Sequence, residues 1–251
     1  VIEPFQEMGK YSADVHRVLK GASDLTGYRV IVRDNLVCWN YATGQMTIEN
    51  DLASKWEITP DGKEYTFTLR KGLGWSDGEP LTADAFMYYY EDMLLNEEMT
   101  PTFPSWLSSG GEPCVFEKVD DHTFKIKFQA PYGILPMFLC FRYGSIDTFV
   151  PKHYLSQFHP NYAKKEDLDK KVKDFGVSDW KELLGYWSPV TSMFTNPDRP
   201  VILSWQTKVP PPATRYVMER NPYFWQVDPA GNQLPYIDQI AMDLFLSLIH
   251  I

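Results

Sequence analysis

The stretch DLASKWEITPDGKEYTFTLRKGLGWSDGEPLTADAFMYYYEDML, residues 51–94, carries the densest run of structural signals in the chain. Within it PDGK, residues 60–63, predicts a hairpin turn, because Gly62 can adopt the positive φ that such a turn needs. In YTFTL, residues 65–69, apolar and polar residues alternate with the period of a strand that has one apolar face. The sequence therefore predicts a β-hairpin here.

The second half of this stretch predicts a turn and then a helix. SDGEP, residues 76–80, contains the Gly and Pro that interrupt a strand. Thr82 is the predicted N-cap, and Asp84 places a negative charge in the first turn, where the helix dipole favours it. Apolar residues then recur at spacings of three and four, as on one buried helix face: Phe86, Met87, Tyr90, Met93 and Leu94. Turn, cap and packing chemistry account for these residues without a ligand.

Weaker patterns lie on either side of this region. SADVHRVLKGA, residues 12–22, predicts an amphipathic helix that ends near Gly21. YRVIVRDNLVCWN, residues 28–40, is almost continuously apolar, which fits either a buried strand or the end of a helix. A second alternating segment at 124–128 predicts a strand that can pair with the one at 65–69.

Beyond residue 100 the chain becomes irregular and rich in Pro and Trp. A helix is predicted after Pro151, and a lysine-rich, exposed helix is predicted at 164–175. VILSWQ (201–206) and TRYVMERN (214–221) predict two strands joined by a proline-stiffened connection.

The charge balance argues against one class of partner. The 251 residues carry 24 Lys+Arg against 33 Asp+Glu, a net charge of -9, and an acidic surface repels phosphate backbones. We therefore expect no nucleic-acid partner. The basic run KKEDLDKKVK, residues 164–173, alternates with acids and is interpreted as a solvated helix face rather than an anion site. No apolar run approaches the length of a membrane span.

Cysteine and histidine spacing predicts no metal site and no cofactor. Cys38, Cys114 and Cys140 form no CxxC pair and are interpreted as buried thiols, with no disulfide supported by the sequence. His153 and His159 are six residues apart and would not share a helix face. DPAGN, residues 228–232, lacks the further acidic ligands of a calcium loop, so a plain β-turn is favoured.

Motifs for catalysis are missing from the sequence, whereas aromatic residues are abundant. There is no GxSxG elbow and no glycine-rich phosphate loop. Phe, Trp and Tyr make up 15% of the chain, and their rings suit sugar stacking or a peptide pocket, although most are expected in the core. A carbohydrate-active enzyme with an aromatic cleft stays open as an alternative, since sequence spacing cannot show whether two carboxylates meet.

Residues 51–94 closely resemble the signature block of extracytoplasmic solute-binding proteins of the oligopeptide-binding family, the capture components of ABC-type importers. The Trp-Glu pair, the Asp-Gly turn, the YTFTLR strand and WSDGEP all match its pattern. Further segments are similar to the family's later elements: VDDHTFKIKF (119–128), PKHYL (151–155), ERNPYFW (219–225) and QLPYIDQI (233–240). One segment departs, since FTNPDRPV (194–201) stands where the family usually has a glycine-rich turn near its cleft.

The resemblance implies an α/β fold: the first lobe of a two-lobed, periplasmic-binding-protein-like (type II) fold with an inserted α+β subdomain. Residues 1–45 and 185–251 would form the discontinuous base of lobe one, and 46–184 the inserted subdomain, with WSDGEP in it and away from the ligand. The second lobe would be absent. The two ends of the sequence, including the unusual residues 246–251, give the expectation of a fragment of a longer protein.

The function implied by the resemblance is transport rather than catalysis. The protein would bind an extracellular solute, most often a peptide, and deliver it to the permease subunits of an ABC transporter. An oligosaccharide-binding protein of the same transporter class is the alternative. A monomer is expected, located in the periplasm or anchored at the cell surface as a lipoprotein. With one lobe missing, this chain alone is not expected to bind its ligand tightly.

The resemblance also implies where the ligand would lie. The ligand-facing parts of lobe one would be the segment near 21–24 and TPTFPSW, residues 100–106. The predicted substrate-binding residues are Asp24, Phe103 and Trp106, with core packing as the competing interpretation for the two aromatic rings.

Overall fold

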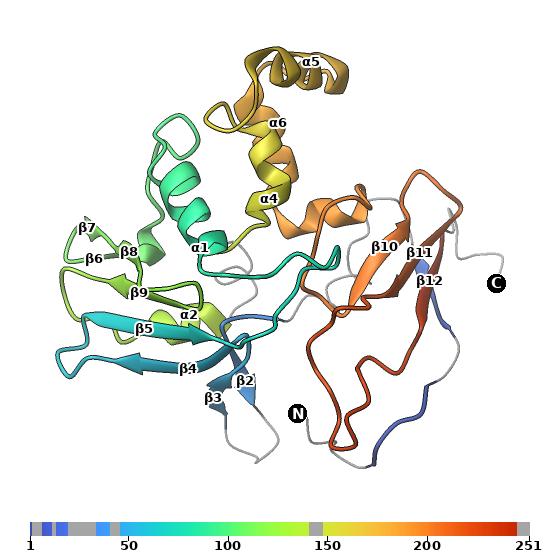
Figure 1. Cartoon of the computed structure of the whole chain (residues 1–251), viewed down its shortest axis with the longest axis horizontal. Helices are drawn as coiled ribbons and strands as arrows, with labels where there is room; N and C mark the ends of the chain where they lie inside the picture. The colour runs from blue at the N-terminus through green and yellow to red at the C-terminus, as the bar shows by residue number, and fades with distance from the viewer. Residues whose placement is uncertain (2–6, 12–13, 20–33, 41–45, 141–147, 245–251) are drawn as a thin grey trace. The chain divides into compact units, whose positions relative to one another are not determined.

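The computed structural model describes residues 1, 7–11, 14–19, 34–40, 46–140 and 148–244. Contacts between residues divide the chain into two compact units. Unit 1 comprises Val1–Arg33, Gly74–Pro80 and Thr191–Ile251, and unit 2 comprises Asp34–Leu73 and Leu81–Val190. Each unit contains a four-stranded sheet among its described residues (Figure 1).

The main sheet of unit 2 is antiparallel, with the strand order β4-β5-β9-β8. Its strands are β4 (Ala53–Ile58), β5 (Glu64–Leu69), β8 (Val115–Lys118) and β9 (Thr123–Lys127). Gly62 lies in the turn between β4 and β5 with φ of 69°, which confirms the predicted hairpin. The predicted pairing of the two alternating segments is also confirmed, with Phe67 opposite Phe124.

Aromatic packing joins this sheet to the helix that follows it. Tyr65, Phe67 and Phe124 are fully buried on one face of the sheet. Phe86 of the helix stacks on Phe124 with ring centroids 4.3 Å apart, and Phe67 stacks on the same ring at 5.6 Å. Each such ring contributes about 1.5–3 kcal/mol by burial and about 0.5–1.5 kcal/mol more by ring geometry. The alternation seen in the sequence is therefore the pattern that builds the core of unit 2.

The helix itself begins one residue later than its predicted cap implies. It runs as α1 (Asp84–Tyr88) and continues as the π-helix η1 (Tyr89–Leu94). The prediction of Thr82 as N-cap is wrong, since the cap position is Ala83, which has no side-chain acceptor. Thr82 Oγ1 instead accepts the N–H of Asp84 at 3.4 Å, and the N–H of Ala83 donates to the carbonyl of Asp121 at 2.9 Å. The carbonyl of Asp121, in the turn before β9, thus satisfies one of the N–H groups at the start of the helix.

The predicted apolar stripe is buried except for Met87, which is half-buried. Tyr88 is buried as well, because a second helical cluster packs on the other side of α1. That cluster contains Tyr88, Met93, Val150, Leu155, Phe158, Leu183 and Leu184.

The helices predicted after Pro151 and at 164–175 are confirmed as α4 (Lys152–Leu155) and α5 (Lys165–Phe175). The 3₁₀ turn η3 (Ser156–Phe158) and the helix α6 (Trp180–Trp187) were not predicted. A further 3₁₀ turn, η4 (Val190–Phe194), begins at the last residue of unit 2 and continues in unit 1. α5 ends at Gly176, whose φ of 82° allows a left-handed cap. α6 starts with a reciprocal capping box: Asp179 accepts the N–H of Glu182, and the Glu182 carboxylate accepts the N–H of Ser178.

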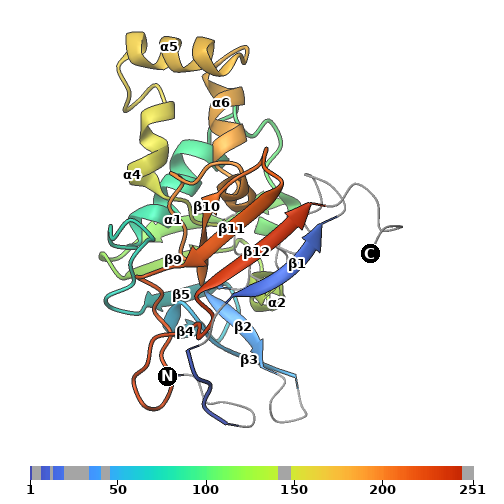
Figure 2. The same ribbon diagram turned by 90° about the vertical axis from the view of Figure 1, so that its right-hand side faces the viewer.

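The sheet of unit 1 has the order β1-β12-β11-β10 (Figure 2). Its strands are β1 (Val15–Leu19), β10 (Trp205–Val209), β11 (Arg215–Arg220) and β12 (Gln239–Leu244). β1 lies parallel to β12, and the other neighbours are antiparallel. The two strands predicted after residue 200 are present, although the first begins at Trp205 rather than Val201.

The prediction of a helix at 12–22 is wrong in its described part. Val15–Leu19 forms β1, and residues 12–13 and 20–22 lie outside the described residues. Apolar residues at 15, 18 and 19 fit a helix, but valine is β-branched and suits a strand equally well. Pairing along the whole of β12 decides the outcome, because backbone hydrogen bonds with a distant segment leave no signal in the local sequence.

The SDGEP turn belongs by its contacts to unit 1. The N–H of Ser76 donates to the carbonyl of Val201 at 2.8 Å, and Ser76 Oγ accepts the N–H of Val201 at 3.0 Å. Gly74–Pro80 lies within the range 46–184 of the sequence, and by its contacts it groups with the other two segments of unit 1.

Gly78→Ala is expected to destabilise unit 1 by about 1–3 kcal/mol, measured as the free energy of unfolding in urea. Gly78 has φ of 90°, and a Cβ there would lie 3.0 Å from Cζ of Tyr223. Gly231→Ala is the matched control, since its φ is 83° and nothing lies within 4 Å of the added Cβ. The first loss should exceed the second, and adding Tyr223→Ala should remove the difference. Equal losses in the two single variants would show that Tyr223 contributes nothing.

His159 is a buried histidine beside the helical cluster of unit 2. The residue is 1% exposed, and its ring meets the Trp180 ring edge-on at 4.9 Å. Nδ1 accepts the N–H of Asn161 at 3.2 Å, and Nε2 finds no partner among the described residues. Burial lowers the pKa of His159, against the opposing charge of Asp92.

The free energy of unfolding is therefore expected to fall as pH drops below about 6.5, the ordinary histidine pKa. The unfolded chain binds a proton there while the folded one resists it, so stability is complete above that pH and is lost towards the lower folded pKa. His159→Asn keeps an acceptor near Asn161 but cannot be protonated, and should flatten the slope between pH 7 and 5. His153→Asn, at an exposed histidine, should leave the slope intact. The same slope in all three proteins would contradict the assignment to His159.

Candidate functional site

The structure describes two of the three predicted substrate-binding residues. Asp24 lies outside the described residues. Phe103 and Trp106 both belong to unit 2 and are both half-buried. Phe103 lies in the segment that leads into the 3₁₀ turn η2 (Ser105–Leu107), which carries Trp106.

The position of Trp106 is set by its backbone. The phenol of Tyr132 donates to the Trp106 carbonyl at 2.7 Å, and the next residue, Leu107, is fully buried. After η2 the chain turns back at once through β6 (Ser108–Ser109) and β7 (Glu112–Pro113). Gly110 and Gly111, with φ of 68° and 86°, provide the tight two-residue turn between these strands. The backbone of Trp106 is thus held in place by the hydrogen bond from Tyr132 and by the tight β6–β7 hairpin that follows it.

The pKa of Tyr132 is raised by burial, so its hydroxyl stays protonated and remains a donor to Trp106. Its own carbonyl in turn accepts the hydroxyl of Tyr65 at 2.7 Å. This chain of hydrogen bonds connects the backbone of Trp106 to the central strand β5 of the sheet.

A short helix next to η2 exposes an apolar face. This helix is α2 (Leu135–Cys140), and it also contacts the hairpin of β2 (Val37–Asn40) and β3 (Thr47–Asn50). Two residues of α2, Leu135 and Leu139, are fully buried. On its other face Met137 is 40% exposed and Ile134, just before the helix, is 45% exposed.

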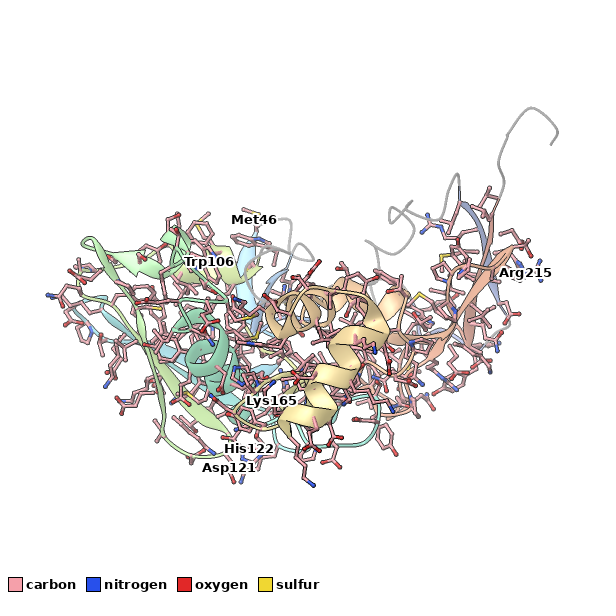
Figure 3. All side chains as sticks on the ribbon, turned by 90° about the horizontal axis from the view of Figure 1, so that it is seen from above. Met46, Trp106, Asp121, His122, Lys165 and Arg215 are labelled. Carbon is pink, nitrogen blue, oxygen red and sulfur yellow. The ribbon has the colours of Figure 1, made fainter. Side chains whose placement is uncertain are left out.

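Trp106 lies against this face. Its ring is 6.0 Å from the ring of Phe138, which is half-buried. We call Trp106, Ile134, Met137 and Phe138 the α2 patch. Met46, which is exposed and precedes β3, lies along the same edge of unit 2 as Trp106 (Figure 3).

The α2 patch offers apolar contact and ring stacking, since none of its four side chains is ionisable. Nothing in it can act as a general acid or a general base. In the described part of the chain, no group of three or more His, Cys, Asp and Glu residues could hold a metal ion.

The sequence predicted Trp106 as a ligand contact but made no prediction for the other three residues of the patch. Residues 134, 137 and 138 are apolar at the spacing of one helix face, which was the available signal. Pro136 and the irregular sequence around it obscured this helical spacing. Pro136 lies in the first turn of α2, where proline is tolerated because its missing N–H has no helical partner there.

The DPAGN segment is a turn held by its own aspartate, as predicted. Asp228 Oδ1 accepts the N–H groups of Ala230 and Asn232, and Oδ2 accepts the Asn232 side-chain amide and the Tyr236 hydroxyl. Hydrogen bonds from Asn232 and Tyr236 lower the pKa of Asp228 to about 2. The carboxylate is fully occupied as a structural acceptor.

Among the described residues, no helix is both long enough and apolar enough to cross a membrane.

The fold matches solved structures of binding proteins over almost the whole chain. An oligopeptide-binding protein, OppA, superposes with a TM-score of 0.85 and 35% identity over 97% of this chain and 37% of the other. The periplasmic binding protein MelB from Agrobacterium fabrum C58, in complex with stachyose, gives a TM-score of 0.72 and 26% identity over 94% of this chain and 35% of the other. The class defined by this fold is the type II periplasmic binding protein, of which the chain forms a mixed α/β part.

The sequence places the chain within one family of that class. Residues 47–184 match the middle region of family 5 of the bacterial extracellular solute-binding proteins. The chain belongs to this family. The periplasmic alpha-galactoside-binding protein of Rhizobium meliloti is 32% identical over 198 residues, which cover 77% of this chain and 25% of that relative. The chain thus spans about a quarter to a third of its relatives' length, and family membership indicates a location outside the cytoplasm.

If the α2 patch is a free surface, changes within it should cost little stability. Met137→Ala is expected to alter the free energy of unfolding by no more than about 0.5 kcal/mol, as for other surface substitutions. Leu139→Ala, two residues along the same helix but fully buried, should cost about 2–5 kcal/mol. Urea denaturation of both variants measures the difference. Comparable losses would mean that Met137 is part of the core.

Proposed function

We propose that the protein containing this chain captures a solute outside the cytoplasm, most often a peptide, and delivers it unchanged to the permease subunits of an ABC transporter. The observation that carries this proposal is the fold match to OppA, which extends over 97% of the chain with a TM-score of 0.85. Family membership over residues 47–184 supports the same function.

In this proposal the chain supplies one side of a two-lobed clamp that closes around the solute by a hinge motion. Residues 1–45 and 185–251 form the base of the first lobe, and 46–184 form its inserted subdomain. The second lobe is supplied by a part of the protein outside this sequence. We propose that the protein acts as a monomer, and that it is held in the periplasm or at the cell surface by a lipid anchor.

Asp24, Phe103 and Trp106 remain the proposed ligand contacts. The exposure of the α2 patch supports Trp106, because its ring lies beside a solvent-facing apolar helix face rather than within the core. Such a surface suits the apolar side chains of a peptide. It also suits the apolar face of a sugar ring.

An oligosaccharide is the second candidate solute. It is favoured by the alpha-galactoside-binding relative at 32% identity and by the stachyose complex of MelB. A catalytic function has no such support, since the family and the structural neighbours are solute-binding proteins. We therefore propose that the bound solute is not chemically changed.

Calorimetric titration of the protein extended to its relatives' full length tests the proposal. Peptides are expected to show saturable binding, and mass spectrometry should recover them unaltered. Saturable binding of stachyose alone would select the second candidate, and turnover of either ligand would overturn the proposal. The present chain without the extension should bind neither tightly, because one face of the ligand would stay in water.

Trp106→Ala in the extended protein is expected to weaken binding roughly tenfold, which corresponds to about 1.4 kcal/mol. Trp187→Ala is the matched control, since Trp187 is also half-buried in unit 2 but packs against the helical cluster and the rings of Phe175 and Tyr186. Unchanged affinity in the Trp106 variant would remove Trp106 from the site.

A further inference from the structure

We propose that Met137 is a site of reversible oxidation to the sulfoxide, which turns the α2 patch from an apolar surface into a polar one. The effect of this change on solute binding rests on the function proposed above, whereas the oxidation itself does not. The nine methionines of the chain differ widely in exposure, and this difference singles out a small group that includes Met137.

The methionines fall into three classes by exposure. Three are exposed: Met8 at 50%, Met46 at 57% and Met137 at 40%. Four are buried, with 8% exposure or less: Met93, Met193, Met218 and Met242. Met87 and Met99 are half-buried. Because an oxidant must collide with the sulfur, the three exposed residues are expected to react first.

Two of the three exposed methionines lie at one edge of unit 2. Met137 belongs to the α2 patch, and Met46 precedes β3, which α2 contacts. Met46 also lies along the same edge as Trp106 (Figure 3). Met8 belongs to unit 1 and is not part of the patch, so it serves as a reference for exposure alone.

The oxidation uses an oxidant from outside the protein, and we take this to be hydrogen peroxide. A lone pair of the Met137 sulfur attacks one peroxide oxygen, the O–O bond breaks, and the other oxygen leaves as water. The sulfur is oxidised by two electrons and the peroxide is reduced by two. A dithiol reductase reverses the step, since its two thiols become a disulfide while the sulfoxide oxygen leaves as water. A protein outside the cytoplasm meets such oxidants away from the reducing pool of the cytosol.

The sulfoxide changes what the α2 patch can contact. The thioether of Met137 is apolar, and its oxidation adds an S–O group that accepts hydrogen bonds. Ile134 and Phe138 carry no donor for this oxygen. An apolar solute group laid on the patch would cover the oxygen without a partner or leave a gap beside it, and either outcome weakens the contact.

Oxidation of Met137 is expected to leave the fold intact. Leu135 and Leu139 are the fully buried residues of α2, and Met137 points its exposed side chain to solvent between them in the sequence. The added oxygen therefore enters water rather than the core. A loss of affinity without a loss of stability distinguishes this switch from general oxidative damage.

Peptide mapping tests the oxidation site. The protein extended to its relatives' full length is treated with increasing hydrogen peroxide, and mass spectrometry follows each methionine. Met137 is expected to be oxidised well before Met193, Met218 and Met242, which should react readily only after unfolding in urea. Oxidation of Met137 no faster than that of these buried residues in the folded protein would overturn the proposal, whatever the protein binds.

Calorimetry with trileucine and stachyose as probe solutes tests the consequence. Peroxide is expected to weaken binding about tenfold in the wild-type protein without lowering its Tm, and a methionine sulfoxide reductase with dithiothreitol should restore the affinity. Met137→Leu should keep its affinity after peroxide, whereas the controls Met8→Leu and Met46→Leu should lose theirs as the wild type does.

The outcomes separate this proposal from the proposed function. An unchanged affinity of the oxidised wild-type protein, or an equal loss in Met137→Leu, would overturn the switch. Binding of neither probe before oxidation would count against the proposed function, and the peptide map would still decide whether Met137 is the oxidised residue.

Discussion

The stacking of Phe86 and Phe67 on the ring of Phe124 is the interaction on which unit 2 depends. It joins α1, β5 and β9. Phe67 on β5 and Phe124 on β9 are 57 residues apart in the sequence, and α1 lies between them. Because all three rings are fully buried, the loops that leave this core start from fixed points. In the sequence η2 lies between α1 and β9, and α2 follows β9, so both segments start from this core. The position of Trp106 on η2 therefore depends on the aromatic core.

Local pattern predicted the parts of the fold whose partners are close in sequence. The β4–β5 hairpin needs only Gly62 and a period of two, and α5 is a lysine-rich helix that ends at its own glycine cap, Gly176. β1 was predicted wrongly because its partner, β12, lies more than 200 residues away, and a helix matched the local apolar spacing. Thr82 failed as a cap for a related reason, since the carbonyl of Asp121 on another turn accepts the Ala83 N–H. In each case a distant backbone group decided the conformation.

The candidate site was likewise predicted only in part from the sequence. Trp106 could be selected from the sequence by its position relative to a recognisable block, but Ile134, Met137 and Phe138 could not, because their exposure depends on which face of α2 packs inward. Leu135 and Leu139 take the inward positions, and the helix then presents its remaining apolar residues to solvent.

A six-residue helix such as α2 has little stability of its own, since the cost of nucleation is spread over only two turns. The orientation of α2 must therefore come from its two buried side chains, Leu135 and Leu139, and from its contacts with β2, β3 and η2. This packing leaves Met137 exposed and places Phe138 beside Trp106. The α2 patch therefore keeps its shape only while the helix stays packed against the β2–β3 hairpin.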